Sequence, residues 1–389
     1  MKYLPGGLGN ITGFSSLGKH IGIKDEGKDF AILYSDTVCN AVAVYTQNKV
    51  RGAPLYVTKQ HIADHQAQAI VVNSRIANVA TGQQGRLNAQ KTTELVADEL
   101  GINPTNVLVA STGIIGLQLP MEKIAVGSKG IKQQLSPDGD FAEAILTTDT
   151  HKKEICVEVD GFKIAGVAKG SGMIEPNMAT LLVFIVTDAD ITPDQLQVSL
   201  KIGVDKTFNM TSIDTDTSTS DMAILMSNGT VKDVNLKKFQ QALDQVCLEL
   251  TKMIARDGEG VTRLLICEVA GAKTESDAKK VAKSVINSPL VKTAVYGHDP
   301  NWGRIMMAIG KSGAEAVDET DAQVWINQEP TVENGTVATN FDAEKLSHIL
   351  KSNDEITIKI DLGQGQHAAT AYGCDMSEEY VKINTEYTT

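Results

Sequence analysis

An unbroken run of apolar residues, Leu181 to Val186, constrains the fold of this chain more than any other feature. A strand that is apolar at every position is buried on both faces, so other elements must pack on each side of it. A glycine-rich, turn-prone stretch precedes the run, and Thr180 lies at the junction. Because threonine is β-branched and often begins strands, a loop leading into a core strand is one interpretation.

The remaining chain alternates strands with helices. A helix is predicted over Asn88 to Leu100, with Gly101 just past its end, and Asp160-Gly161 predicts a hairpin turn because both residues tolerate positive φ. After a helix predicted over Asp277 to Val285, short strands and turns dominate. We therefore place a smaller C-terminal unit at residues 284–389.

A glycine motif at residues 363–368 follows a strand predicted at Ile356 to Ile360. A dinucleotide-binding loop would need a helix next, because the helix N-terminus holds the pyrophosphate. Residues 369–372 instead suit a return strand, so we predict a hairpin.

Composition restricts the class of protein. The 389 residues are 42% apolar and 22% charged, with a net charge of −12. An acidic chain without clusters of Lys and Arg is not expected to bind nucleic acid or an anionic membrane. The five cysteines are scattered and the histidines lack metal-ligand spacing, so we expect neither disulfides nor a metal site. The N-terminus has no secretory signal, so a cytoplasmic enzyme or binding protein is expected.

Thr180 also has a second, chemical interpretation. Its hydroxyl can attack the carbonyl of Ala179, and hydrolysis of the resulting ester leaves Thr180 with a free α-amine. This amine has a reference pKa of about 7.7–8.0, so it can act as general base for its own hydroxyl. No catalytic histidine is then required.

Such a nucleophile needs donors for the developing oxyanion. Ser111-Thr112-Gly113 follows a strand predicted at Val107 to Ala110, where backbone N–H groups and a hydroxyl can converge. An ordinary strand-ending turn is the alternative.

These residues belong to motifs that together resemble the ornithine acetyltransferase (glutamate N-acetyltransferase) family of arginine biosynthesis. The resemblance covers nearly the whole chain. The similar motifs are Lys169-Gly-Ser-Gly-Met-Ile-Glu-Pro-Asn-Met-Ala-Thr180, Ser111-Thr-Gly-Ile-Ile-Gly116, Leu119-Pro-Met-Glu-Lys123, Thr147-Thr-Asp-Thr150, Arg256-Asp-Gly-Glu-Gly260, Ser288-Pro-Leu-Val-Lys-Thr293, Asp299-Pro-Asn-Trp-Gly-Arg304 and residues 380–389.

The resemblance implies an α+β fold, a layered αββα sandwich of the self-cleaving N-terminal-nucleophile type with a smaller C-terminal α/β subdomain. Cleavage between Ala179 and Thr180 would give an α chain (1–179) and a β chain, whose part 180–283 completes the core. The chains would pair as α2β2. Thr180 would carry acetyl from N2-acetylornithine to glutamate in a ping-pong cycle. No cofactor is implied, but some members accept acetyl-CoA, which makes it a candidate co-substrate.

The resemblance also implies the roles of single residues. Thr112 and Gly113 would form the oxyanion hole. The substrate contacts would be Thr148 (in preference to Thr147), Lys169, Thr180, Glu259, Asn384 and Thr389. A carboxylate such as Glu259 suits the ornithine ammonium, and Lys169 suits an amino-acid carboxylate.

The chain departs from the family pattern in two segments. Arg75 and Ile76 replace a usual Gly and Asn, and Thr215 and Ser220 likewise replace a Gly and an Asn. If these segments line the substrate cleft, a paralogue for another N-acyl amino acid is an alternative. There are two further alternatives. One is an N-terminal-nucleophile amidohydrolase or aminopeptidase, and the other is a non-catalytic binding protein whose chain stays intact.

Overall fold

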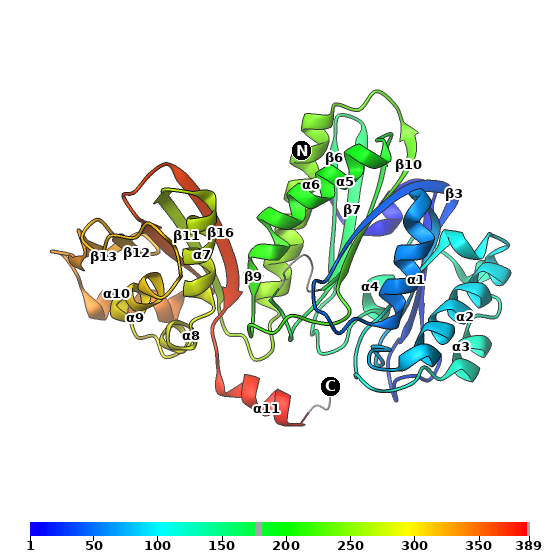
Figure 1. Ribbon diagram of the computed structural model, residues 1–389, viewed down its shortest axis with the longest axis horizontal. Coiled ribbons are helices and arrows are strands. Elements are labelled where there is room, and N and C mark those ends of the chain that lie inside the picture. Colours follow the sequence, from blue (N-terminus) through cyan, green and yellow to red (C-terminus); the bar gives the residue numbers. More distant parts are fainter. Residues whose placement is uncertain (176–180, 387–389) are drawn as a thin grey trace.

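The computed structural model describes residues 1–175 and 181–386, and these residues build two lobes, each around a mixed sheet (Figure 1). Ala179, Thr180 and Thr389 lie outside the described residues. The N-terminal lobe holds the strand predicted from the apolar run, and the C-terminal lobe holds the later short strands.

In the first lobe the strand order is β1-β6-β7-β8-β10-β3-β4-β5, with β2 beside β3. The strands are β1 (Lys2–Leu4), β2 (Phe14–Lys19), β3 (Phe30–Tyr45), β4 (Gln66–Asn73), β5 (Val107–Ser111), β6 (Lys153–Val159), β7 (Phe162–Lys169), β8 (Leu182–Ala189) and β10 (Met222–Val231). The helices are α1 (Ala53–His61), α2 (Gly82–Leu100), α3 (Met121–Gly127), α4 (Phe141–Ala144), α5 (Pro193–Lys206) and α6 (Leu236–Arg256).

The long strand β3 divides this sheet into two layers. Its first part pairs with β2 and β4, its last part pairs with β10, and the register with β4 shifts between Tyr34 and Cys39. Because the sheet folds over here, Ile70 and Leu108 of one layer share a core with Phe184 and Ile224 of the other.

Helices cover both outer faces of the two layers. Helices α5 and α6 pack on the layer that contains β8, and α2 and α3 pack on the layer that contains β4 and β5 (Figure 1). The predicted αββα sandwich is therefore confirmed. Along β8, Val183 and Ile185 face the helices, whereas Leu182, Phe184 and Val186 face the opposite layer. This double burial explains why the run is apolar at every position.

Two local predictions are also confirmed. Helix α2 includes the predicted segment, begins several residues earlier, and ends at Gly101, which has a φ of 74°. Strands β6 and β7 form the predicted hairpin, with φ of 49° at Asp160 and 86° at Gly161, as a type I′ turn requires.

The second sheet has the order β14-β13-β12-β15-β11-β16-β9. Its strands are β9 (Thr211–Ser212), β11 (Leu264–Ala272), β12 (Gln323–Ile326), β13 (Glu329–Glu333), β14 (Thr336–Val337), β15 (Glu355–Asp361) and β16 (His367–Cys374). The helices of this part are α7 (Glu275–Ile286), α8 (Pro289–Tyr296), α9 (Trp302–Gly310), α10 (Ala343–Ser352) and α11 (Glu378–Glu386).

Strand β11 changes two expectations about this lobe. It lies before residue 284 yet pairs with β15 and β16, so the sheet takes in residues upstream of the predicted start of the smaller unit. The predicted hairpin is wrong. Strand β16 does return antiparallel, but β11 is inserted between β15 and β16, and Gln364 of the connecting loop donates from its backbone to Gly271 at the end of β11. These pairings join residues about 90 to 110 positions apart along the chain, which no local pattern reveals.

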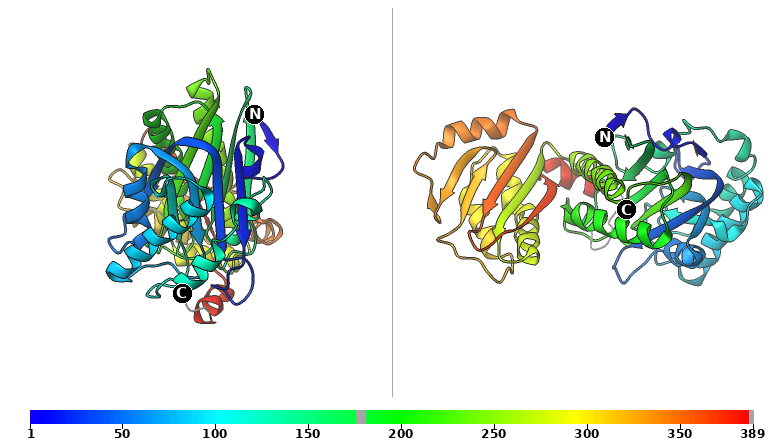
Figure 2. Two further views of the ribbon diagram at one scale, coloured as in Figure 1. Left: turned by 90° about the vertical axis from the view of Figure 1, so that its right-hand side faces the viewer. Right: turned by 90° about the horizontal axis from the view of Figure 1, so that it is seen from above.

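The C-terminal helix links the two lobes. After β16 the chain runs to α11, which lies below both lobes in Figure 1. Ser377 Oγ donates to the carbonyl of Gly260 over 2.5 Å, which fixes the start of this segment beside the loop that follows α6. The right-hand view of Figure 2 shows the two lobes side by side from above, and in the left-hand view the first lobe lies in front of the second.

Candidate active site

A cavity of about 260 Å³ lies where α11, the loop after α6 and the ends of the first sheet meet. Every predicted site residue within 1–175 and 181–386 lines it: Thr112, Gly113, Thr147, Thr148, Lys169, Glu259 and Asn384. Thr180 and Thr389 are outside the described residues, so the structure does not place them. A larger cavity of about 800 Å³, between α1 and α2, contains none of the predicted residues.

The oxyanion candidates Thr112 and Gly113 follow directly after β5. The backbone N–H of Thr112 donates to Asn73 at the end of the neighbouring strand β4, over 3.1 Å. Gly113 has a φ of 123°, and a Cβ there would lie 2.2 Å from the carbonyl carbon of Arg75. Only glycine fits such a position. The two parallel strand ends thus hold the turn that carries Thr112 in place.

Lys169 is the last residue of β7 and faces the same cavity. Its Nζ lies 3.3 Å from Thr112 Oγ1 and donates to it, which leaves the threonine O–H available to a ligand oxygen. Asp149 accepts from the backbone N–H of Gly170 over 2.6 Å. Burial raises the pKa of the Asp149 carboxyl, but Lys169 and Lys153 outweigh it and hold this pKa well below its usual range. Asp149 therefore remains ionised beside Lys169.

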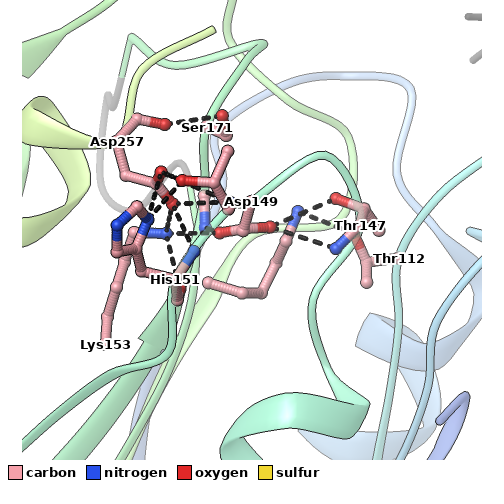
Figure 3. A network of polar contacts seen from close by, with 10 residues as sticks. Thr112, Thr147, Asp149, His151, Lys153, Ser171 and Asp257 are labelled. Carbon is pink, nitrogen blue, oxygen red and sulfur yellow. Dashed lines mark hydrogen bonds and ion pairs between the residues drawn. The ribbon is translucent and has the colours of Figure 1, made fainter. Parts of the chain in front are cut away.

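A buried ion-pair network lies next to the residues that line the cavity, and Figure 3 shows its side chains. Lys153 Nζ lies 2.7 Å from Asp149 Oδ1 and 2.5 Å from Asp257 Oδ2, and all three side chains are buried. Asp257 also accepts from the backbone N–H of Thr150 over 3.0 Å, and its carbonyl accepts from Ser171 Oγ over 2.6 Å. Because these contacts join residues 147–153, 169–171 and 257–259, three walls of the cavity are fixed together.

Glu259 places a carboxylate on the cavity opposite in charge to Lys169. It is buried, its backbone N–H donates to Ser171 over 2.9 Å, and Asn384 Nδ2 donates to its Oε2 over 2.7 Å. Helix α11 thus brings a C-terminal residue to a loop of the first lobe. Asp214 and Asp216 also line this cavity, so it presents one ammonium and three acidic side chains. Such a mixed lining suits an amino acid, which carries both charges.

Residues 214–221 form a further wall that includes one of the departing segments. Asp214 accepts from the backbone N–H groups of Met173 and Ile174 over 2.6 and 2.8 Å, which anchors the chain just before residue 176. Burial raises the pKa of Asp214. Burial, followed by the nearby Asp214 charge, also raises the pKa of Tyr380. Asp214 and Tyr380 were not predicted as cavity residues from the sequence. A signal existed for Asp214, because an Asp that precedes short polar residues commonly accepts from backbone N–H groups.

The two positions where glycine is usual keep a glycine-like backbone. Arg75 has a φ of 83° and Thr215 a φ of 70°. Left-handed backbone at a non-glycine residue costs about 1–2 kcal/mol, most clearly for a β-branched threonine. The substitutions therefore preserve the local geometry at a cost in stability.

Ser220 and Asp221 are a buried polar pair at the start of β10. Within the described ranges, Ser220 Oγ and Asp221 Oδ2 have no hydrogen-bond partner. Burial raises the pKa of the Asp221 carboxyl well above its ordinary value. The next residue, Met222, donates from its backbone to Leu181 over 3.0 Å, so this pair lies beside the start of β8. Ser220 departs from the family pattern and was singled out from the sequence, whereas Asp221 was not, although a lone acid before an apolar strand is a signal.

Two kinds of feature are absent from the described residues. Across 1–175 and 181–386, no group of three or more His, Cys, Asp or Glu side chains is placed to hold a metal ion. None of the helices in these ranges is long and apolar enough to cross a bilayer.

An αββα sandwich with this cavity at the start of a doubly buried strand defines an enzyme of the N-terminal-nucleophile fold class. The chain matches the ArgJ family over residues 15–389 and belongs to that family. It is 46% identical over 379 residues to an arginine biosynthesis bifunctional protein ArgJ 2 of Clostridium acetobutylicum, covering 97% of both chains. It is also 46% identical over 398 residues to the ArgJ protein of Staphylococcus aureus, covering 99% of this chain and 96% of the relative.

A solved structure agrees. The crystal structure of an ArgJ protein from Bacillus halodurans is 40% identical, with a TM-score of 0.50, and the match covers 52% of this chain and 98% of that chain. These relatives favour the arginine-biosynthesis family over a paralogue of another pathway.

Proposed function

We propose that this enzyme transfers acetyl from N2-acetylornithine to glutamate, giving ornithine and N-acetylglutamate, through an acetyl ester on Thr180. One observation carries the proposal. A single cavity is lined by residues from distant parts of the sequence, namely Thr112, Gly113, Lys169, Glu259 and Asn384. The names of the relatives, which refer to arginine biosynthesis, support the same conclusion.

Cleavage comes first in this proposal. The Thr180 hydroxyl attacks the Ala179 carbonyl carbon, the peptide C–N bond breaks, and the nitrogen takes up the proton to become the α-amine of Thr180. Water then hydrolyses the ester, which leaves a carboxylate on Ala179 and restores the hydroxyl. Both flanks are held, because Asp214 anchors residues 173 and 174 and β8 begins at Leu182.

Acetyl transfer then uses the liberated α-amine as a base. It takes the hydroxyl proton while Thr180 Oγ attacks the acetyl carbonyl, and Thr112 Oγ1 and the Gly113 N–H donate to the oxyanion. The C–N bond to ornithine breaks as the leaving nitrogen receives the proton. Glutamate enters, and its amine attacks the ester in the reverse sense. Lys169 binds the α-carboxylate, and Glu259, oriented by Asn384, binds the ornithine ammonium.

The finer parts of the proposal concern donors, contacts and assembly. We propose that Thr148 and Thr389 complete the substrate contacts, and that acetyl-CoA serves as a second donor without any bound cofactor. The α and β chains stay associated as α2β2 and work in the cytoplasm.

The reaction is tested by incubating the protein with N2-acetylornithine, with and without glutamate. We expect N-acetylglutamate only when glutamate is present, and little free acetate in either case. Equal release of acetate in both incubations would instead identify a hydrolase.

The cleavage is tested by denaturing gel electrophoresis with N-terminal sequencing. We expect a fragment that begins Thr180-Leu181-Leu182, and a single intact chain for Thr180→Ala. A matched control, Thr230→Ala at an exposed threonine, should still be cleaved. An uncut wild-type chain refutes the mechanism.

A further inference from the structure

The largest of these cavities, about 800 Å³, lies outside the site described above. It is formed between α1 and the first turns of α2, which lie side by side in the outer helical layer (Figure 1). The residues that matter for its chemistry are Arg51, Tyr56, Gly82, Gln83, Arg86 and Leu87. A volume of this size is within the range of cavities that hold cofactor-sized ligands.

The charge of this cavity is opposite to that of the protein. The chain carries a net charge of −12 and has six arginines, of which Arg51 and Arg86 line this cavity, whereas its lining contains no Asp or Glu. Within residues 1–175 and 181–386, neither arginine forms an ion pair with a carboxylate. Two uncompensated guanidinium groups on one cavity favour a ligand with more than one negative charge.

Both arginines are held in place by contacts that do not neutralise them. The Arg86 guanidinium carbon lies 4.1 Å from the centre of the Tyr56 ring, a cation–π contact, and Arg51 Nε donates to the carbonyl of Asn48 over 2.9 Å. A stacked guanidinium keeps its in-plane N–H groups available to phosphate oxygens. Tyr56 and Leu87 are large, exposed apolar side chains, so the cavity also offers a surface to a base or an alkyl chain.

The cavity lies close to the active site, although the two have no lining residue in common. Ala77 lines the smaller cavity and Ala80 lines the larger one, and three residues of extended chain span at most about 11 Å. On the other side, the backbone N–H of Gly52 donates to the carbonyl of Thr219 over 3.0 Å, and Thr219 lines the active site. A ligand held in the larger cavity is therefore within reach of Thr112 if it has a long arm.

We propose that this cavity binds the phosphate-bearing nucleotide end of the acetyl thioester donor, with the flexible arm carrying the acetyl group toward Thr112. The inference rests on the proposed use of acetyl-CoA as second donor and adds the place where its anionic part binds. In the transfer step, Thr180 Oγ attacks the thioester carbonyl, the C–S bond breaks, and the departing sulfur takes the proton that the α-amine removed from the hydroxyl. The shared chemistry, a phosphate ester, could also belong to a free nucleotide.

The binding test uses coenzyme A, which has no acyl group to transfer, in isothermal titration calorimetry at low and high salt. Arg51→Gln and Arg86→Gln should each weaken binding about tenfold, because each removes one charge-assisted contact with phosphate, and added salt should weaken binding to the wild type. The matched control is Lys201→Gln on α5, an exposed cation on the opposite outer layer, which should bind like the wild type. Equal affinity in all four proteins, or no binding to the wild type, overturns the inference.

Kinetic measurements distinguish coenzyme A from a free nucleotide as the ligand. They also distinguish failure of this inference from failure of the proposed transferase. Arg86→Gln should raise KM for acetyl-CoA about tenfold and leave transfer from N2-acetylornithine unchanged. If AMP binds at the two arginines but coenzyme A does not, the site is one for a free nucleotide and the donor assignment falls. If coenzyme A fails to bind while transfer from N2-acetylornithine is normal, this inference fails and the proposed transferase stands. If the wild type transfers no acetyl but binds coenzyme A through the two arginines, the proposed transferase fails and the assigned binding site stands.

Discussion

Lys153 offers a direct test of the buried network behind the active site. Its ammonium is shared by Asp149 at 2.7 Å and Asp257 at 2.5 Å, and all three side chains are buried. Lys153→Met keeps the length of the side chain but removes the charge, so two carboxylates are left without this cation. Removal of one partner from a buried ion pair costs about 3–5 kcal/mol, because the remaining charge is buried without compensation.

The pH dependence of this loss follows from Asp149. Its pKa is held below the unfolded value, so its ionisation contributes stability that is present above about pH 4 and is lost as the pH falls through the folded pKa. Without Lys153 this pKa rises, and protonation relieves the buried charge in mild acid. The stability difference between the variant and the wild type should therefore be largest near neutral pH and shrink toward pH 4.

The measurement is the free energy of unfolding from urea titrations at several pH values between about 4 and 7. The neighbouring Lys152 is exposed, so Lys152→Met is the matched control and should change stability by less than about 0.5 kcal/mol. A Lys153→Met protein as stable as the wild type, or a loss that does not change with pH, would refute the reasoning.

Three further variants probe single features of the site. Thr112→Val removes the hydroxyl but keeps the shape, and should lower kcat for acetyl transfer about 100- to 1000-fold in steady-state assays; an unchanged kcat contradicts its oxyanion role. The pKa of Asp221 is raised by burial, so its contribution to stability is present at low pH and is lost as the pH rises. Asp221→Asn should therefore stabilise the protein near neutral pH and have little effect near pH 4, in thermal unfolding followed by circular dichroism; destabilisation at neutral pH would indicate an unseen partner. Thr215→Gly removes the backbone strain at a φ of 70° but raises the conformational entropy of the unfolded chain. Calorimetry should therefore show a gain in the free energy of unfolding of at most about 1 kcal/mol, and a clear loss would contradict backbone strain at this position.

Local features of the fold were predictable because they depend on short stretches of sequence. The apolar run of β8 predicted double burial, Asp160-Gly161 predicted a tight hairpin, and Gly101 predicted a helix end. The position of β11 between β15 and β16 was not predictable, because parallel pairing joins residues far apart in sequence and leaves no periodic signal beyond a buried strand.

The candidate site was likewise predictable where it depends on local motifs, and not where it depends on contacts made only after folding. Family motifs predicted the candidate site residues, and the structure places the described ones on one cavity. The supporting carboxylates were missed. Asp149 and Asp257 lie inside quoted motifs, but their function depends on Lys153, which occupies an ordinary strand position in sequence and becomes a shared cation only after folding. The larger cavity was equally hidden, since Arg51 and Arg86 are brought together only by the packing of α1 against α2.

The central claim, that Thr180 carries the acetyl group, is tested most directly by mass spectrometry of the rapidly quenched enzyme. After mixing with N2-acetylornithine alone, the fragment that begins at Thr180 should gain the mass of one acetyl group, located on that residue by fragmentation. Addition of glutamate should remove this mass and produce an equal amount of N-acetylglutamate. An unmodified Thr180 fragment during turnover, or an acetyl group located on another residue, would contradict the account.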